Sequence, residues 1–130
     1  MTLSESREDY LENLLILETR SGGFVRQVDM ASRMGFSKAS ISKAMSSLSA
    51  EGYVEFRPRG LVRLSNGGRK IAERVYDRHC FFFKVLTNLG TNLGIPTEIA
   101  QRDACRMEHA MSEESYQALK KELSSKMDVQ

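Results

Sequence analysis

The sequence predicts a mainly α-helical fold in which an N-terminal winged helix-turn-helix with a two-stranded wing precedes a helical C-terminal domain. Three observations lead to this prediction. Apolar residues recur at helical spacing over most of the chain. Two short helical segments joined by a glycine-containing turn lie between residues 25 and 52. Two short strand-like segments then flank the turn signal Pro58-Arg59-Gly60.

Small polar residues and glycines mark the limits of the N-terminal elements. Ser6 is expected to cap a first helix that reaches Thr19 and stops at Ser21-Gly22-Gly23. A second helical segment begins at Val25 and ends at Gly35. Ser37 caps a third helix, which stops near Gly52. Residues 53–57 and 61–64 are the expected strands of the wing.

The C-terminal half predicts three more helices. The first follows Ser65 and carries an apolar run to Leu89, with a loop containing Gly90 and Gly94 behind it. Pro96 suits the first position of the next helix, and Ser112 starts the last one. We expect residues 126–130 to fray. The domains are therefore predicted as residues 1–74 and 75–130.

Composition limits the class of protein. The chain has 130 residues, of which 41% are apolar and 28% charged, as in ordinary globular proteins. No apolar run approaches the ~20 residues that span a bilayer, and the N-terminus lacks the pattern of a secretory signal. Two cysteines cannot form a disulfide framework. We expect a cytoplasmic protein with no membrane partner, in which cysteines are free thiols or metal ligands.

The formal charge of +2 hides an asymmetry along the chain. Residues 1–19 carry a net charge of −4, residues 20–74 carry +7 and residues 75–130 carry −1. A basic middle segment indicates contact with a polyanion, although clustering on a solvated surface is the simpler alternative.

The expected third helix has the features of a DNA-recognition helix. In a helix-turn-helix the N-terminal end of the second helix reaches base edges in the major groove. Lysines and serines in that region can contact phosphates or bases, and arginines of a wing suit backbone contacts. A surface helix rich in serine and lysine is the alternative. The candidate DNA-binding residues are Ser37, Lys38, Ala39, Ser40, Ser42, Lys43, Arg57 and Arg59.

A second constellation indicates a metal site. Cys105, Glu108 and His109 are spaced i, i+3 and i+4, which places them on one helical face. A thiolate, a carboxylate and an imidazole suit a divalent transition metal. Asp9 and Glu12 repeat the i, i+3 spacing near the N-terminus.

Each candidate ligand also has an ordinary structural explanation. Asp9 can simply favour a helix N-terminus, and His79 can be a satisfied buried imidazole. Cys105 can serve as core filler. Both histidines of the chain, His79 and His109, nevertheless fall into the candidate set.

Three segments carry a resemblance to a known family: Glu8-Asp9-Tyr10-Leu11-Glu12, Arg78-His79, and Asp103-Ala104-Cys105-Arg106-Met107-Glu108-His109. They resemble the diphtheria-toxin-repressor family, and more narrowly its manganese-transport-regulator branch. Proteins of that family are homodimeric bacterial repressors that bind palindromic operators when loaded with Mn(II) or Fe(II), and so shut down metal-uptake genes. The resemblance implies a metal-dependent repressor that binds double-stranded operator DNA and is not an enzyme. Larger relatives carry a further C-terminal domain, for which we expect no room in this chain.

The resemblance also implies a set of metal ligands. Cys105 stands where the manganese branch has a carboxylate and the iron-responsive branch has a cysteine, so a carboxylate-bridged pair of ions is not expected. Asp9 stands where the iron branch has methionine. Phe83 and Gln101 replace the carboxylate and histidine of the iron branch's ancillary site, which is therefore not expected either. The residues that match ligands of the manganese branch are Asp9, Glu12, His79, Glu108 and His109.

Two alternative functions remain open. One is a winged-helix dimer that binds DNA without metal, and the other is a metal-dependent enzyme, although no phosphate loop, nucleophile elbow or cofactor fingerprint is present. Dimerisation itself is inferred from the apolar surface of the C-terminal half; the alternative is a core within one chain. The residues that contribute this surface are Phe81, Phe82, Phe83, Val85, Leu86, Ile99, Met107, Met111 and Leu119.

Overall fold

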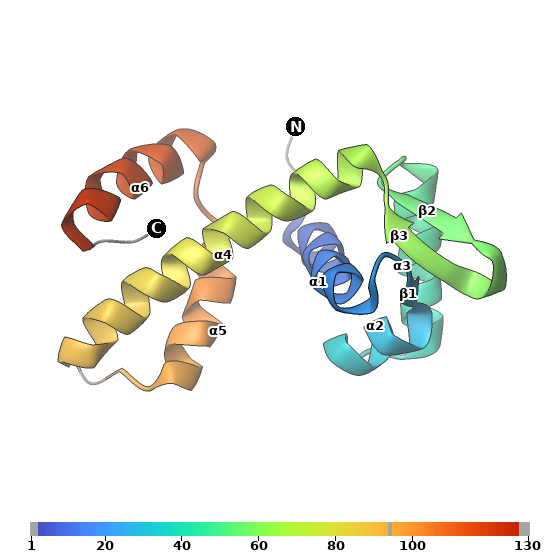
Figure 1. Cartoon of the computed structure of the whole chain (residues 1–130), viewed down its shortest axis with the longest axis horizontal. Coiled ribbons are helices and arrows are strands. Elements are labelled where there is room, and N and C mark those ends of the chain that lie inside the picture. Colours follow the sequence, from blue (N-terminus) through green and yellow to red (C-terminus); the bar gives the residue numbers. More distant parts are fainter. Residues whose placement is uncertain (1–2, 94, 128–130) are drawn as a thin grey trace. The chain divides into compact units, whose positions relative to one another are not determined.

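The predicted mainly α fold with an N-terminal winged helix-turn-helix is confirmed by the computed structural model (Figure 1). The structure describes residues 3–93 and 95–127, and it describes residues 88–93 and 127 through their backbone only. The chain forms two compact units, which meet between Arg74 and Val75. The elements are α1 (Glu5–Ser21), β1 (Val25–Arg26), α2 (Gln27–Met34), α3 (Lys38–Ala50), β2 (Val54–Arg57), the short 3₁₀ turn η1 (Pro58–Gly60), β3 (Leu61–Leu64), α4 (Asn66–Leu93), α5 (Thr97–Met107) and α6 (Glu113–Met127).

The first helix starts earlier than the sequence predicted. Ser4, not Ser6, is the N-cap: its backbone is extended and its hydroxyl accepts a hydrogen bond from the Arg7 backbone N–H at 3.3 Å. Ser6 lies inside the helix. The backbone N–H three residues after it is already bonded within the helix and needs no capping side chain. The predicted stop at Gly22 is confirmed, because Gly22 has a φ of 87° and donates to the Glu18 carbonyl.

The two-stranded wing pairs with a third, short strand that the sequence did not predict. Val25 and Arg26 form β1, which pairs antiparallel with β3 at Val62 and Leu61, so α2 begins only at Gln27. A two-residue strand is too short to show a period of two. β2 and β3 form the predicted hairpin, and the sheet order is β1-β3-β2.

A single core fills the N-terminal unit. It joins α1 to α3, the helix that Ser37 caps by accepting from the Ser40 N–H at 3.1 Å. Glu18 is buried beside this core, with 6% of its surface exposed. Its carboxylate accepts hydrogen bonds from the Leu64 N–H at 2.7 Å and from Arg69 at 2.5 Å. The buried core residues are Leu11, Leu14, Val25, Met30, Ala31, Ile41, Met45, Leu48, Val54, Val62, Leu64 and Ala72.

The C-terminal unit contains most of α4 together with α5 and α6. The predicted loop at Gly90 is wrong, since α4 continues through this residue to Leu93; a glycine inside a helix costs only about 1 kcal/mol. Gly94 lies outside the described residues. Pro96 is the N-cap of α5, not its first residue. The predicted start of α6 is confirmed, but that helix includes Lys126 and Met127, and residues 128–130 are not described.

A second core belongs to the C-terminal unit. Phe81, Phe82 and Val85 of α4 are buried against Ala104 and Tyr116. Three of the residues that were expected to offer a dimer surface therefore pack within one chain. Ile99, by contrast, is 38% exposed. Among the described residues, no helix is both long and apolar enough to cross a membrane.

The contact between α4 and Tyr53, the residue before β2, gives a test of the packing of the N-terminal unit. A Cβ atom on Gly68 would lie 2.0 Å from the Tyr53 carbonyl oxygen, whereas one on Gly67 would meet nothing closer than the Ser65 hydroxyl at 3.9 Å. We expect Gly68→Ala to lower the free energy of unfolding by about 2 kcal/mol through overpacking. The matched variant Gly67→Ala should be neutral or stabilising by under about 1 kcal/mol. Urea denaturation followed by circular dichroism measures both, and equal midpoints would contradict the packing argument.

Candidate functional site

The N-terminal end of α3 forms an exposed polar surface. All six candidate residues of this helix start, residues 37–40, 42 and 43, are exposed, while Ile41, Met45 and Leu48 face the core. The helix is therefore amphipathic, with its serine and lysine face turned to solvent. Small side chains such as Ala39 and Ser42 allow close approach to another surface. The arrangement fits the predicted recognition helix, whose contacts with DNA stay a prediction.

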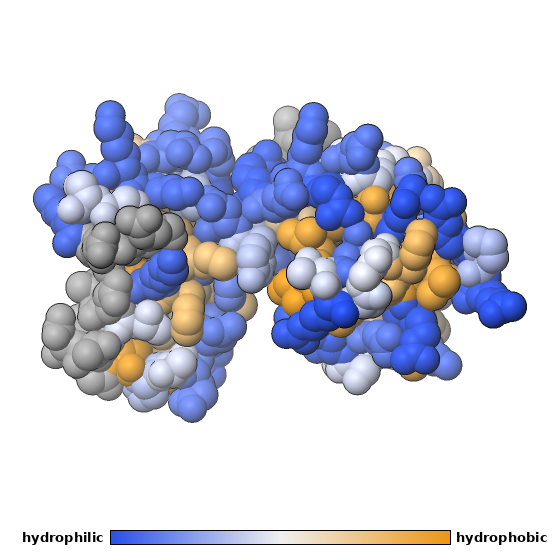
Figure 2. All heavy atoms as spheres, in the orientation of Figure 1, coloured by the Kyte–Doolittle hydropathy of each residue, from blue (hydrophilic) through white to orange (hydrophobic). Residues whose placement is uncertain are grey.

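The wing presents its arginines beside exposed aromatic rings. Arg57 and Arg59 are exposed, whereas Arg63 pairs with Glu55 at 2.8 Å. The guanidinium groups of Arg57 and Arg63 lie 5.4 and 5.6 Å from the centre of the Phe24 ring. Figure 2 shows apolar patches set among hydrophilic side chains on the N-terminal unit. A cation held over an aromatic ring is partly ordered before it meets any partner.

The tip of the wing is held in an unusual conformation. Arg59 has a φ of 68°, in the left-handed region that non-glycine residues seldom adopt. The Gln27 side-chain amide donates to the neighbouring Gly60 carbonyl at 2.8 Å. This hydrogen bond joins the tip of the wing to the start of α2.

Four of the six candidate metal ligands lie in the C-terminal unit. His79 comes from α4, Cys105 from α5, Glu108 from the C-cap of α5, and His109 from the residue after it. The ligand atoms of His79, Cys105 and Glu108 lie within 4.8 Å of one another. The group contains the Cys105 thiol and the Glu108 carboxylate of the predicted helical face, but its imidazole is that of His79 and not that of His109.

The carboxylate of Glu108 is the centre of this cluster. Glu108 is 1% exposed. Its Oε2 lies 3.1 Å from His79 Nδ1, and its Oε1 lies 3.3 Å from His109 Nε2. The Cys105 Sγ lies 3.5 Å from the same His79 nitrogen, although Cys105 itself is exposed. Both histidines of the chain therefore converge on one buried carboxylate.

These neighbours change the protonation of His79. The hydrogen bonds with Cys105 and Glu108 raise the pKa of the His79 imidazole to about 10, against a smaller opposing effect of burial. A positive imidazolium is thus the counter-charge for the buried carboxylate in the metal-free chain. The same donor atoms are those that a divalent cation would take.

Asp9 and Glu12 lie three residues apart on α1, in the N-terminal unit. This spacing places both carboxylates on one face of that helix. That they join the ligands of the C-terminal unit stays a prediction. The expected absence of an ancillary site also stays a prediction: the Phe83 ring stacks on His79 at 6.4 Å, and the Gln101 amide nitrogen lies 3.4 Å from His79 Nε2.

Arg78 belongs to the Arg78-His79 pair that carries the resemblance, but the sequence alone assigned it no role. Arg78 is 7% exposed and lies on the same stripe of α4 as Val75, Phe82 and Val85. A charged residue on an otherwise apolar, buried stripe must find partners inside the protein. That conflict between charge and period was visible in the sequence, and it is the signal that could have identified Arg78.

Family models match both units of the chain. Residues 2–62 match the iron dependent repressor N-terminal DNA binding domain. Residues 65–126 match the iron dependent repressor metal binding and dimerisation domain. The chain belongs to the iron-dependent repressor family.

Individual members of the iron-dependent repressor family show the same relation. The transcriptional regulator MntR of Escherichia coli O6:H1 is 38% identical over 113 residues, which cover 87% of this chain and 70% of MntR. The iron-dependent repressor IdeR of Mycobacterium bovis is 28% identical and spans 95% of this chain. A manganese-dependent transcriptional repressor solved with manganese has a TM-score of 0.75 at 26% identity over 95% of this chain. The chain spans only 52% of IdeR and 53% of that solved structure.

The hydrogen bonds of His79 predict a titration that can be measured directly. In the metal-free chain, kept with a chelator, the His79 ring should titrate at a pKa of about 10. Because this value lies above 6.5, the imidazolium stabilises the fold fully below pH 6.5, and its contribution is lost as the pH rises towards 10. Cys105→Ala should lower the pKa of His79, since it removes the largest contribution.

Proton NMR of the two histidine rings measures this pKa, with His109→Gln to assign the signals. A His79 ring that titrates near 6.5, or one unaffected by Cys105→Ala, would contradict the geometry.

Proposed function

We propose that this chain is a metal-dependent transcriptional repressor that senses Mn(II) or Fe(II) and represses metal-uptake genes. It acts as a homodimer on double-stranded palindromic operator DNA in the cytoplasm, and it is not an enzyme. The observation that carries the proposal is the convergence of His79, Cys105 and Glu108 within 4.8 Å, in the unit that matches a metal binding domain. Family membership and the exposed polar face of α3 support the DNA-binding part.

The proposed ligands combine hard and soft donors. Carboxylate oxygens suit Mn(II), whereas a thiolate moves the preference towards Fe(II). We assign the first preference to Mn(II), because Asp9 and Glu12 both offer carboxylates, and keep Fe(II) as the second. When bound, the ion would supply positive charge that balances carboxylates otherwise crowded together. The full proposed set is Asp9, Glu12, His79, Cys105, Glu108 and His109.

The proposed ligands come from both units, so a bound ion would link the two units. Asp9 and Glu12 belong to α1, which shares its core with α3. His79, Glu108 and His109 belong to the C-terminal unit, which we propose to dimerise. Ligation by both groups would fix α1, and with it α3, against the dimer. The two α3 helices would then match successive major grooves ~34 Å apart.

This is a population shift between two arrangements of the units. The ligands must bind the cation better in the DNA-competent arrangement than in the other, since otherwise no shift results. Operator DNA must in turn tighten cation binding by the same factor. The α3 residues 37–40, 42 and 43 would contact bases and phosphates, while Arg57 and Arg59 would contact the backbone beside them.

The first test is a metal titration of DNA binding. Fluorescence anisotropy with a duplex from the chain's own promoter should show tighter binding with Mn(II), and with Fe(II) under anaerobic conditions. Cys105→Glu should favour Mn(II) further, while Cys105→Ala should weaken the response to Fe(II) more than that to Mn(II). Operator affinity that neither ion changes would refute the proposal. A metal response unchanged in both variants would show that Cys105 is not a ligand.

A second test separates phosphate contacts from mere surface charge. Lys38→Ala and Lys43→Ala should each weaken operator binding and reduce the slope of log affinity against log salt by about 1. Lys121→Ala, an exposed lysine of α6, is the matched control and should leave the slope unchanged. The same anisotropy assay at several salt concentrations measures all three. Equal slopes in all variants would remove α3 from the DNA interface.

A further inference from the structure

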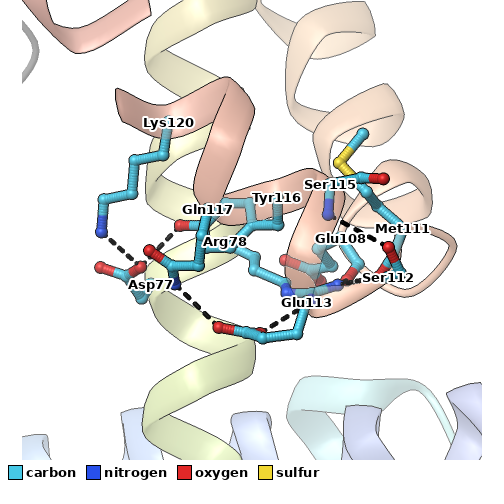
Figure 3. Close-up of polar contacts among 10 residues, drawn as sticks. All are labelled: Asp77, Arg78, Glu108, Met111, Ser112, Glu113, Ser115, Tyr116, Gln117 and Lys120. Atoms are coloured by element: carbon cyan, nitrogen blue, oxygen red, sulfur yellow. Dashed lines mark hydrogen bonds and ion pairs between the residues drawn. The ribbon is translucent and has the colours of Figure 1, made fainter. Parts of the chain in front are cut away.

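A buried arginine holds the loop that follows α5. One nitrogen of the Arg78 guanidinium, Nη1, donates to the backbone carbonyl oxygens of Glu108 and Met111, at 3.2 and 2.5 Å. A second nitrogen, Nη2, donates to the Glu113 carboxylate at 2.9 Å. The guanidinium carbon also lies 4.8 Å from the centre of the Tyr116 ring. Figure 3 shows these contacts radiating from Arg78 to the loop and to the start of α6.

Of the two carbonyl groups that Arg78 binds, that of Glu108 belongs to the C-cap of α5, and that of Met111 lies in the loop beyond it. The last carbonyls of a helix have no partner within it, and α5 ends at Met107 without a glycine in the left-handed cap position. A cation at a helix C-terminus is also favoured by the helix dipole. Arg78 therefore does for α5 what a C-capping motif does elsewhere, but from another helix.

The position of this cap matters because of the residues it holds. Glu108 and His109 lie between Met107, where α5 ends, and Met111, whose carbonyl Arg78 binds. His79 is the residue after Arg78, and it contacts the Glu108 carboxylate at 3.1 Å. Helix α4 thus contacts Glu108 at two places: Arg78 binds its backbone carbonyl, and His79 contacts its carboxylate.

We propose that Arg78 is a positioning residue for the metal centre: by binding the Glu108 and Met111 carbonyls it sets the direction of the Glu108 and His109 side chains. This inference rests on the proposed function, because it concerns the same ligands. It adds a residue that the ligand spacing does not include. Groups that orient metal ligands from outside the coordination sphere change metal affinity by about 10- to 100-fold.

The geometry requires arginine specifically. Two carbonyls and a carboxylate lie around one planar guanidinium, whose donors point in fixed directions. A lysine ammonium keeps the charge but presents a single point with rotating donors, which cannot serve the three acceptors in the same way. Arg78→Lys therefore tests orientation separately from charge. Arg78→Met removes both while retaining an unbranched apolar stem.

The control must disturb the same network without touching the loop. Lys120 of α6 lies 5.7 Å from the same Tyr116 ring and donates to Asp77 at 2.8 Å, next to Arg78 in α4. In Figure 3 it stands on the far side of the network from the loop carbonyls. Lys120→Met should lower the thermal stability of the chain without altering the ligands.

The experiment uses Co(II) as a probe, because its visible absorption reports ligand geometry and the presence of a thiolate ligand. The full chain and Lys120→Met should bind Co(II) with the same spectrum and with affinities within about threefold. Arg78→Lys and Arg78→Met should bind about 10- to 100-fold more weakly. At saturating Co(II) their visible spectra should differ from that of the unmodified chain, a change that loss of stability alone would not cause.

Each outcome has a distinct meaning. If the unmodified chain binds neither Co(II) nor Mn(II), the proposed function fails. If it binds Co(II) but both Arg78 variants match its affinity and spectrum, the positioning role is refuted while the function stands. A loss of affinity in Lys120→Met equal to that in Arg78→Lys would also refute it, because general destabilisation would then explain both. If Arg78→Met does not fold by circular dichroism, Arg78→Lys decides.

Discussion

The buried carboxylate of Glu108 is the constraint around which the C-terminal unit is arranged. An ionised carboxylate removed from water is costly unless charges and hydrogen bonds compensate it. His79 and His109 supply ring nitrogens at 3.1 and 3.3 Å, and Arg78 binds the backbone of the same residue. The raised pKa of His79 is the electrostatic consequence. In the metal-free chain a proton on His79 thus provides charge that a cation at the proposed site would provide instead, and such a cation would displace that proton.

The ends of several helices and the spacing of two candidate ligands could be predicted from the sequence, because residues close together in the chain determine them. Gly22 and Gly35 end helices in the left-handed conformation, Ser37 caps α3, and the spacing of Cys105 and Glu108 places both on one side of α5. The parts that could not be predicted depend on contacts between distant segments. Strand β1 forms because Val25 pairs with Val62, which is distant in the sequence. The C-terminal end of α5 is bound by Arg78, which lies 30 residues before Glu108 in the chain. Helical period alone could not decide between Ser4 and Ser6 as the first cap.

Each of the two units contains a buried carboxylate, but the groups that bind the two carboxylates differ. In the N-terminal unit the buried carboxylate of Glu18 accepts from the Leu64 N–H and from Arg69, and so joins α1 to the base of the wing. Its partners are a backbone donor and an arginine, which retain their protons at any physiological pH. The side-chain partners of Glu108 are the imidazoles of His79 and His109, whose nitrogens can hold either a proton or a metal ion. Glu18 therefore makes a permanent joint, whereas the surroundings of Glu108 can exchange protons for a cation.

Helix α1 has the properties needed to carry a constraint from ligands to DNA. Leu11 and Leu14 are fully buried in the core that also contains Ile41 and Met45 of α3. Arg7, two residues before Asp9, forms an ion pair with Glu51 and donates to the Ser47 hydroxyl at 3.2 Å. Helix α1 therefore also contacts the C-terminal end of α3. Because close-packed interiors transmit displacement with little loss, fixing Asp9 and Glu12 in space fixes α3 as well. The proposed ligands on α1 can therefore set the direction of α3, the proposed recognition helix, although none of them lies on it.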